Sequence, residues 1–358
     1  MKRWILLLLL LFLLTEPAWA TLPEEVEDAL PPEAEELLEE LGEANSNTLS
    51  RGMSRLWERA CGLLSEEVRS SISGAVTLLC AVLLCGMTED LFKAAEHPTM
   101  LNIVPLAGVL AITVAAAGDL HSLIGLGIRT MEELDVCSKA LLPTLAAAVA
   151  AGGGIVSAGV RQTATVIFAE LLISLIRQVL LPLVYVYIAA AAADAMLPGF
   201  RLKTIAAGIK KAVTWILTGS LVIFTGYLTL AGAAASSADA LTVSLTRTAI
   251  SAAVPVVGGI ISGAAETVLA GALTLKNALG IFGMLAVLAV CLTPFLHMAV
   301  QYLVYKLTAF LAGVTANESL SGLIDALGGA FGLVLGMTGS CALLLLISIT
   351  SSVSVVMT

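Results

Sequence analysis

Long apolar runs dominate this chain, and short polar stretches separate them. A helix that crosses a bilayer needs about 20 mostly apolar residues. Six runs approach or meet this requirement, near residues 71–87, 100–118, 140–160, 212–235, 278–300 and 330–357. The pattern predicts an all-α protein, a polytopic bundle of transmembrane helices.

Two further regions leave the number of spans open. The apolar run 163–197 is about 50 Å long as one straight helix, whereas a hydrocarbon core is about 30 Å thick. It contains Pro182 near its middle, so it could tilt, kink or cross twice. The run 250–275 contains Pro255 and the pair Gly258-Gly259, which favour a broken or re-entrant helix. We therefore expect about seven or eight spans.

The first 70 residues differ from the rest. Lys2 and Arg3 precede an apolar run that ends before "AWA" at 18–20, which predicts a signal peptide over residues 1–20, with an uncleaved anchor as the alternative. Residues 21–48 are acidic and predict a partly disordered extracytoplasmic arm. Residues 49–70 have apolar positions at helical spacing, so this amphipathic helix either lies on the membrane or docks on a partner.

The membrane region contains two stretches that resemble each other. "GGGIVSAG" begins at Gly152 and "GGIISGA" at Gly258, and each is followed by a proline-containing span. We interpret residues 140–248 and 249–358 as two repeat units, preceded by a transmembrane pair and loop at 71–139. Chance similarity between Gly/Ala/Leu-rich segments is the alternative. The candidate helix-breaking residues of the two units are Gly152, Gly153, Gly154, Pro182, Pro255, Gly258, Gly259 and Pro294.

The linkers that follow the two prolines carry opposite charges. Residues 201–211 are basic, whereas residues 314–325 carry acidic residues and no basic one. Inverted repeats that face opposite sides of a membrane show such a bias. Basic loops favour the cytoplasmic side, so we expect residues 201–211 to lie inside.

Charged residues within apolar segments are the candidate functional residues. An ionised side chain at a helix centre costs about 2.5 to 3.5 kcal/mol on insertion scales, so it pairs or lines a polar path. Glu170 and Arg177 are seven residues apart and share a helix face. Arg177 could also reach a carboxylate on another helix. Glu266 follows the glycine pair and either lines a conduit together with Lys276 and Asn277, or pairs with Lys276 structurally.

Composition excludes several classes of function. Hydrophobic residues make up 58% of the 358 residues and charged residues 13%, which a soluble domain could not accommodate. No nucleotide-binding, zinc-protease or hydrolase motif is present, and the three histidines are scattered. We therefore expect no enzyme activity, no cofactor, no metal site and no nucleic-acid binding.

One block resembles a known family. Residues 249–296, "AISAAVPVVGGIISGAAETVLAGALTLKNALGIFGMLAVLAVCLTPFL", together with "YKLTAFLAG" from Tyr305 and a signal peptide before an acidic arm, resemble the stage III sporulation protein AE family. The resemblance implies a multi-pass subunit of the channel complex that links mother cell and forespore. It further implies ring-forming membrane proteins, an ATPase and a forespore-side protein as partners. The implied place is the mother-cell membrane around the forespore, with the N-terminal arm in the intermembrane space.

Two other functions remain open from the residues alone. The chain could be a stand-alone secondary transporter of a small solute, with Glu266 and Glu170 in its path. It could also be a non-conducting scaffold in which the charges only hold helices together. Assembly into a homo-oligomer is left open as well.

Overall fold

The fold is described by a computed structural model for residues 48–94, 103–196, 202–253, 258–314 and 318–354, which are helical apart from a turn at 152–154. The helices in chain order are α4 (Thr48–Ala94), α5 (Ile103–Ala151), α6 (Ile155–Leu175), the π-helical segment η1 (Ile176–Leu180), α7 (Leu181–Met196), α8 (Leu202–Ala253), α9 (Gly258–Val314) and α10 (Glu318–Ser354). The predicted all-helical fold is confirmed. The predicted signal peptide, and the acidic arm apart from Thr48, lie outside the described residues.

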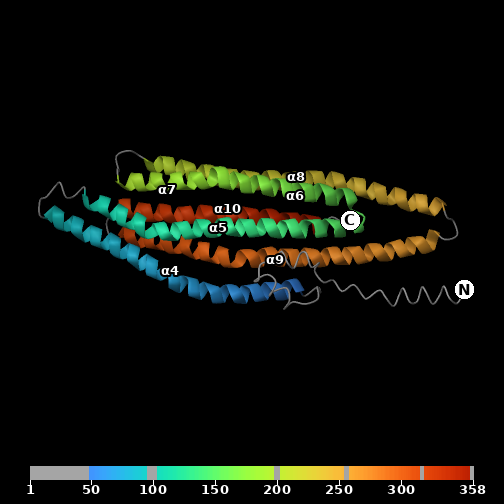
Figure 1. Cartoon of the computed structure of the whole chain (residues 1–358), viewed down its shortest axis with the longest axis horizontal. Coiled ribbons are helices and arrows are strands. Elements are labelled where there is room, and N and C mark those ends of the chain that lie inside the picture. Colours follow the sequence, from blue (N-terminus) through green and yellow to red (C-terminus); the bar gives the residue numbers. More distant parts are fainter. Residues whose placement is uncertain (1–47, 95–102, 197–201, 254–257, 315–317, 355–358) are drawn as a thin grey trace.

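The helices run up and down along one axis (Figure 1). The last turns of α4, α7 and α9 and the first turns of α5, α8 and α10 lie at one end of the bundle, which we call the hairpin end. The turn at residues 152–154, the last turn of α8 and the first turn of α9 lie toward the opposite end. With α6, η1 and α7 taken as one continuous helix, consecutive helices are therefore antiparallel, and α8 runs parallel to α10.

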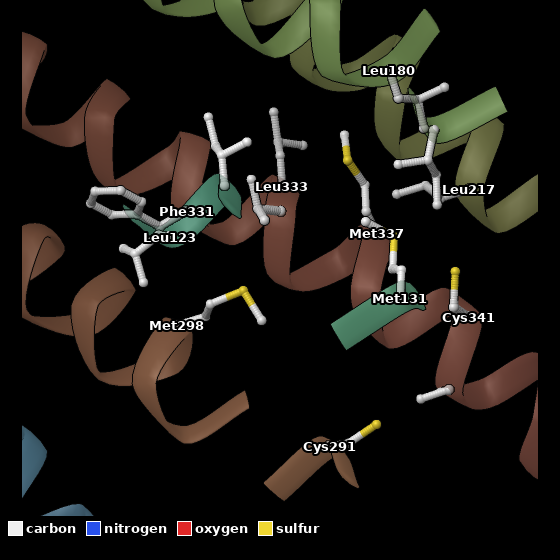
Figure 2. Close-up of a cluster of buried hydrophobic side chains, with 14 of the residues drawn as sticks. Leu123, Met131, Leu180, Leu217, Cys291, Met298, Phe331, Leu333, Met337 and Cys341 are labelled. Carbon is white, nitrogen blue, oxygen red and sulfur yellow. The ribbon is translucent and has the colours of Figure 1, made fainter. Parts of the chain in front are cut away.

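The hairpin of α9 and α10 forms the centre of the bundle. In their apolar stretches 61% of residues are buried, against 17% in α4, and α9 and α10 are the most extensively packed pair. Apolar residues of α4, α5, the continuous stretch α6–η1–α7, and α8 pack with those of α9 and α10 in one cluster. Figure 2 shows part of this cluster. Its labelled members are Leu123, Met131, Leu180, Leu217, Cys291, Met298, Phe331, Leu333, Met337 and Cys341. The other helices thus surround α9 and α10 and present their outer faces to the surroundings.

The structure has fewer and longer membrane-type helices than we predicted. Six are long and apolar enough to cross a membrane within the described ranges, not seven or eight. Helix α5 contains most of the predicted span 100–118, the predicted loop 119–139 and the first part of the predicted span 140–160, which the turn at 152–154 divides between α5 and α6. The charges in that stretch do not end the helix because they find partners: Asp119 accepts a hydrogen bond from the Tyr305 hydroxyl at 2.8 Å, and Asp135 accepts one from Lys139 at 2.7 Å.

The long apolar run 163–197 forms one continuous helical stretch up to residue 196. It continues from α6 through η1 into α7, and together they make one candidate span of 42 residues. Pro182, the second residue of α7, directly follows η1 within this continuous helix and does not end it. The single π-turn before it is the kind of irregularity by which a helix takes up an extra residue.

The other predicted helix breaks have different outcomes. Helix α9 runs without interruption through Pro294, so the break predicted there is wrong. The packing of α9 against α10 holds the helix together, as neighbouring helices do around prolines in membrane spans. Gly258 and Gly259 are the first two residues of α9, while Pro255 lies outside the described residues.

The three glycines Gly152, Gly153 and Gly154 lie at the turn between α5 and α6. Gly153 has φ of 89°, a conformation that residues with a Cβ rarely adopt. The Gly154 amide donates to the Val149 carbonyl at 3.0 Å and the Gly153 amide to Ala150 at 2.9 Å, so the last carbonyls of α5 are satisfied.

The two proposed repeat units point in the same direction. In each unit, one helix (α6–α7 or α9) runs toward the hairpin end, and the next helix (α8 or α10) runs away from it. The inverted arrangement is therefore wrong, because the basic and acidic linkers meet at the same end instead of facing opposite sides. The repeat itself and its boundaries stay predictions. The predicted boundary between residues 139 and 140 falls inside α5, and the one between residues 248 and 249 falls inside α8.

Candidate functional site

Lys276 is the most buried of the predicted site residues. Its side chain is 1% exposed, and its ammonium group donates to the backbone carbonyl of Val353 at 2.7 Å. Helix α9 is continuous through Glu266 and Lys276, so ten residues separate them by about 15 Å along its axis. Their pairing stays a prediction. The Glu266 side chain lies outside the described part, and Asn277 is exposed.

A second buried cation, Arg161 of α6, lies at the same place. It is 5% exposed, and its guanidinium donates to both the backbone carbonyl and the hydroxyl of Ser351. Gly232 of α8 leaves room for it, since a Cβ there would come within 2.6 Å of the Arg161 Nη2 atom. Arg161 Nε has no partner among the described residues.

Both cations bind the last turn of α10. This helix ends at Ser354, so the carbonyls of Ser351 and Val353 are among the four that have no partner within the helix. These carbonyls also carry the negative end of the helix dipole, which attracts cations. Arg161 and Lys276 therefore cap α10 and tie α6 and α9 to it.

A buried carboxylate caps α6 close by. Asp239 of α8 is 7% exposed and accepts hydrogen bonds from the amides of Val156 and Ser157, at 2.8 and 2.9 Å. Gly154 precedes α6 and has no side chain to serve as an N-cap, so Asp239 supplies the missing acceptor from another helix. We call Arg161, Lys276 and Asp239 the buried polar centre.

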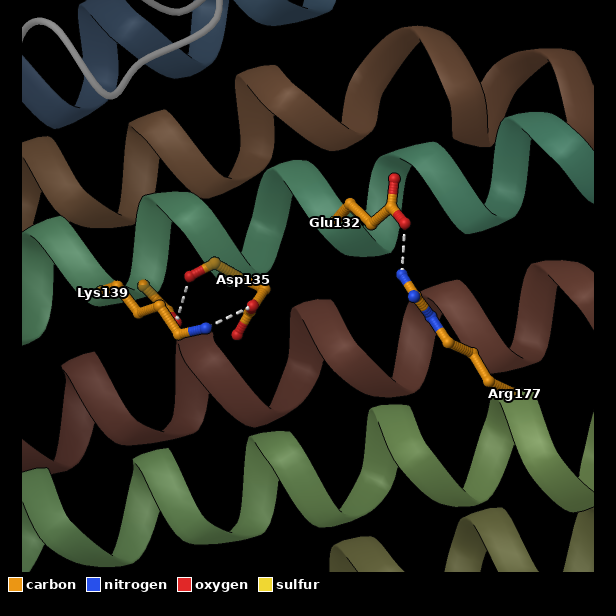
Figure 3. Close-up of polar contacts among 5 residues, drawn as sticks. Glu132, Asp135, Lys139 and Arg177 are labelled. Carbon is orange, nitrogen blue, oxygen red and sulfur yellow. Dashed lines mark hydrogen bonds and ion pairs between the residues drawn. The ribbon is translucent and has the colours of Figure 1, made fainter.

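Arg177 reaches a carboxylate on another helix, one of the two alternatives that the sequence left open, and no ion pair joins it to Glu170 among the described residues. Arg177 of η1 donates instead to Glu132 of α5 at 2.5 Å, and Glu170 is exposed (Figure 3). The side chains of Arg177 and Glu132 are 42% and 53% exposed. One turn along α5, Lys139 bonds to Asp135 (Figure 3). These are ion pairs on the outside of the described bundle, unlike the buried polar centre.

Comparisons with known proteins identify the family. The family model described as stage III sporulation protein AE matches residues 34–356, which is most of the chain. The chain belongs to this family. Stage III sporulation protein AE of Bacillus subtilis (strain 168) is 23% identical over 233 residues, which are 65% of this chain and 58% of the relative. No solved structure matches.

The family membership that residues 249–296 predicted is thus confirmed. In this member of the stage III sporulation protein AE family, two further polar contacts join α9 to other helices. Tyr305 donates to Asp119 of α5, and His297 lies 2.6 Å from the carboxylate of Glu67 on α4. The central helix pair is therefore held by polar as well as apolar contacts.

Sequence reasoning missed Arg161 and Asp239 as site residues. Each is an isolated charge within an apolar run, which is itself a signal of a buried partner. Their partners, however, are 190 and about 80 residues away in the chain. No spacing rule connects residues so far apart, so only the fold could show them together.

Proposed function

We propose that this chain is the multi-pass membrane subunit of a channel or secretion-like complex that links mother cell and forespore and is needed for forespore development. The observation that carries the proposal is membership of a family described as a stage III sporulation protein, over residues 34–356. Six long apolar helices support the membrane part of the proposal.

The length of the helices supports a subunit that extends beyond the bilayer. The shortest of the six candidate spans has 37 residues and is about 55 Å long, whereas a hydrocarbon core is about 30 Å thick. Part of the bundle therefore lies in the headgroup region or outside the membrane. Protein surfaces there are available to partners.

Helix α4 offers such a surface. Its apolar residues Met53, Trp57 and Leu64 are 49%, 72% and 43% exposed, although Leu56 of the same helix is buried. Exposed aromatic and methionine side chains are typical of protein interfaces. We propose that this face binds a partner subunit, such as a ring-forming membrane protein, and that an ATPase and a forespore-side protein complete the complex.

The up-and-down arrangement supports an orientation. If the start of α4 lies in the intermembrane space, the hairpin end lies in the mother-cell cytoplasm. Lys203, Lys210 and Lys211 are near that end. Basic residues favour the cytoplasmic side, as this orientation requires.

Trp57→Ala tests the partner surface, and Trp215→Ala on α8 is its matched control because that side chain is 71% exposed. Each variant replaces the chain in its own host during sporulation. We expect Trp57→Ala to lower the yield of co-purified proteins from the same operon several-fold at unchanged abundance, with Trp215→Ala unaffected. Equal yields from both variants would exclude the α4 face, and absence of operon partners from the wild-type preparation would contradict the complex.

Glu266→Gln distinguishes conduction from scaffolding. A conduit or a solute transporter with Glu266 in its path loses function while the protein still accumulates. A non-conducting scaffold loses function only when its abundance or assembly falls. Spore yield and immunoblots of the same cultures separate the two results.

A further inference from the structure

A polar cavity of about 260 Å³ lies between α7, α8 and α10, near the hairpin end. Each of the three helices contributes a pair of charged or phenolic side chains that are seven residues apart, and α10 adds Ser319. The pairs are Tyr187 and Asp194 of α7, Lys203 and Lys210 of α8, and Glu318 and Asp325 of α10. None of them belongs to the buried polar centre, which lies at the other end of α10.

The spacing arranges these residues in two levels. Residues seven apart share a helix face and are separated by about 10 Å. Since α7 runs opposite to α8 and α10, Asp194, Lys203 and Glu318 form the outer level, near the helix ends. Tyr187, Lys210 and Asp325 form the inner level.

Gly329 of α10 lies at the inner level. A Cβ at this position would come within 2.5 Å of the Tyr187 hydroxyl and 3.5 Å of the Lys210 ammonium nitrogen. Both polar groups therefore converge on the same point of α10. The cavity has an outer end near the helix termini and an inner end defined by these two groups.

The opposite charges face one space without pairing across it. Asp194 accepts from the Lys203 amide at 2.8 Å and Asp325 binds Lys306 of α9 at 2.6 Å. In the described ranges, no ion pair joins the two lysines of α8 to the two carboxylates of α10. The α8 wall therefore presents ammonium groups and the α10 wall presents the carboxylate of Glu318. Asp194 of α7 adds a second carboxylate, while Asp325 is already paired with Lys306.

We propose that this cavity binds a small zwitterion, with its carboxylate or phosphate at Lys203 and Lys210 and its ammonium group at Glu318. A ligand with one sign of charge would be attracted to one wall and repelled by the other, whereas a dipolar ligand matches both. The volume is below the roughly 300 Å³ at which drug-sized pockets begin, so the ligand is small. The binding site goes beyond the proposed function and does not depend on it.

Two sources supply this chemistry: free amino-acid-like solutes and the headgroup of an ethanolamine phospholipid. The test uses the purified full-length protein in a neutral detergent. L-alanine and O-phosphoethanolamine are titrated by calorimetry, with ethanolamine and acetate as single-charge controls. In parallel, thermal unfolding is compared in nanodiscs of phosphatidylethanolamine and of phosphatidylglycerol.

Lys210→Met and Glu318→Gln are the test variants, and Lys211→Met is the matched control. Lys211 is the next residue along α8, but its ammonium group lies 5.6 Å from the centre of the Trp215 ring and lines no part of the cavity. We expect each test variant to weaken binding about ten- to a hundredfold, since a charged hydrogen bond contributes about 1.5 to 3 kcal/mol. Lys211→Met keeps the wild-type affinity.

Saturable binding of either soluble zwitterion that is weakened in the test variants supports a free ligand. Stabilisation by phosphatidylethanolamine alone, lost in the test variants, supports a lipid headgroup. The proposal is overturned if the wild type responds to neither source, if the single-charge controls bind equally well, or if the test variants match Lys211→Met.

Discussion

Arg161 and Lys276 show how single residues determine this fold. A buried cation is costly in an apolar bundle unless it finds an acceptor. Both cations find acceptors at the one place where α10 has spare carbonyls and a negative dipole end. Asp239 is a buried anion, and it accepts hydrogen bonds from the free amides that begin α6.

Gly232→Ala tests the packing of Arg161. The added methyl group would come within 2.6 Å of the guanidinium, which has to move away from Ser351. We expect the free energy of unfolding in detergent to fall by about 1 to 3 kcal/mol, as is typical of overpacking.

Gly226→Ala is the matched control on the same helix. A Cβ at Gly226 meets nothing within 4 Å. Alanine in an exposed helix position stabilises by about 0.5 to 1 kcal/mol relative to glycine. A Gly232→Ala protein as stable as Gly226→Ala would contradict the described position of Arg161.

At the scale of elements, the turn between α5 and α6 depends on Gly153. Its φ of 89° lies in the left-handed region. Gly153→Ala is expected to lower the free energy of unfolding by about 1 to 2 kcal/mol, since a Cβ makes that conformation costly. Gly159→Ala on α6, where a Cβ meets nothing within 4 Å, should be neutral or stabilising. Thermal unfolding of both variants checks this, and equal behaviour would mean that the turn does not need glycine.

The elements also show what the sequence could and could not predict. Apolar composition and run length predicted an all-helical membrane-type chain, because they depend only on local residues. Helix boundaries were less predictable. Charges at Asp119 and Asp135 resemble a loop in the sequence, but a helix longer than the bilayer carries them with partners. Whether Pro294 ends a helix could likewise not be predicted from the local sequence, because the packing of α10 keeps α9 continuous around it.

The candidate sites were less predictable still. Lys276 was identified because it is a charge in an apolar run, but its partner on α10 was not. The cavity at the hairpin end joins the basic and acidic linkers that we had interpreted as facing opposite sides. Such juxtapositions arise from the packing of hairpins that are far apart in the chain.

For the whole molecule, the arrangement of helices predicts that the three hairpin connections lie on one side of the membrane. In a cysteine-free background, we expect Leu91→Cys, Thr204→Cys and Val314→Cys to react with an impermeant maleimide from the same side. Ile155→Cys, at the start of α6, should react from the other side. All four positions are exposed. Labelling of any hairpin position from the same side as Ile155→Cys would contradict the six-crossing arrangement.

The central claim, a membrane subunit of a sporulation complex, is tested most directly by where and when the protein is found. A fluorescently tagged copy is expressed from its own promoter in a sporulating host. We expect no signal in growing cells and enrichment around the engulfed forespore. A uniform membrane signal during growth would contradict this claim and favour a stand-alone solute transporter.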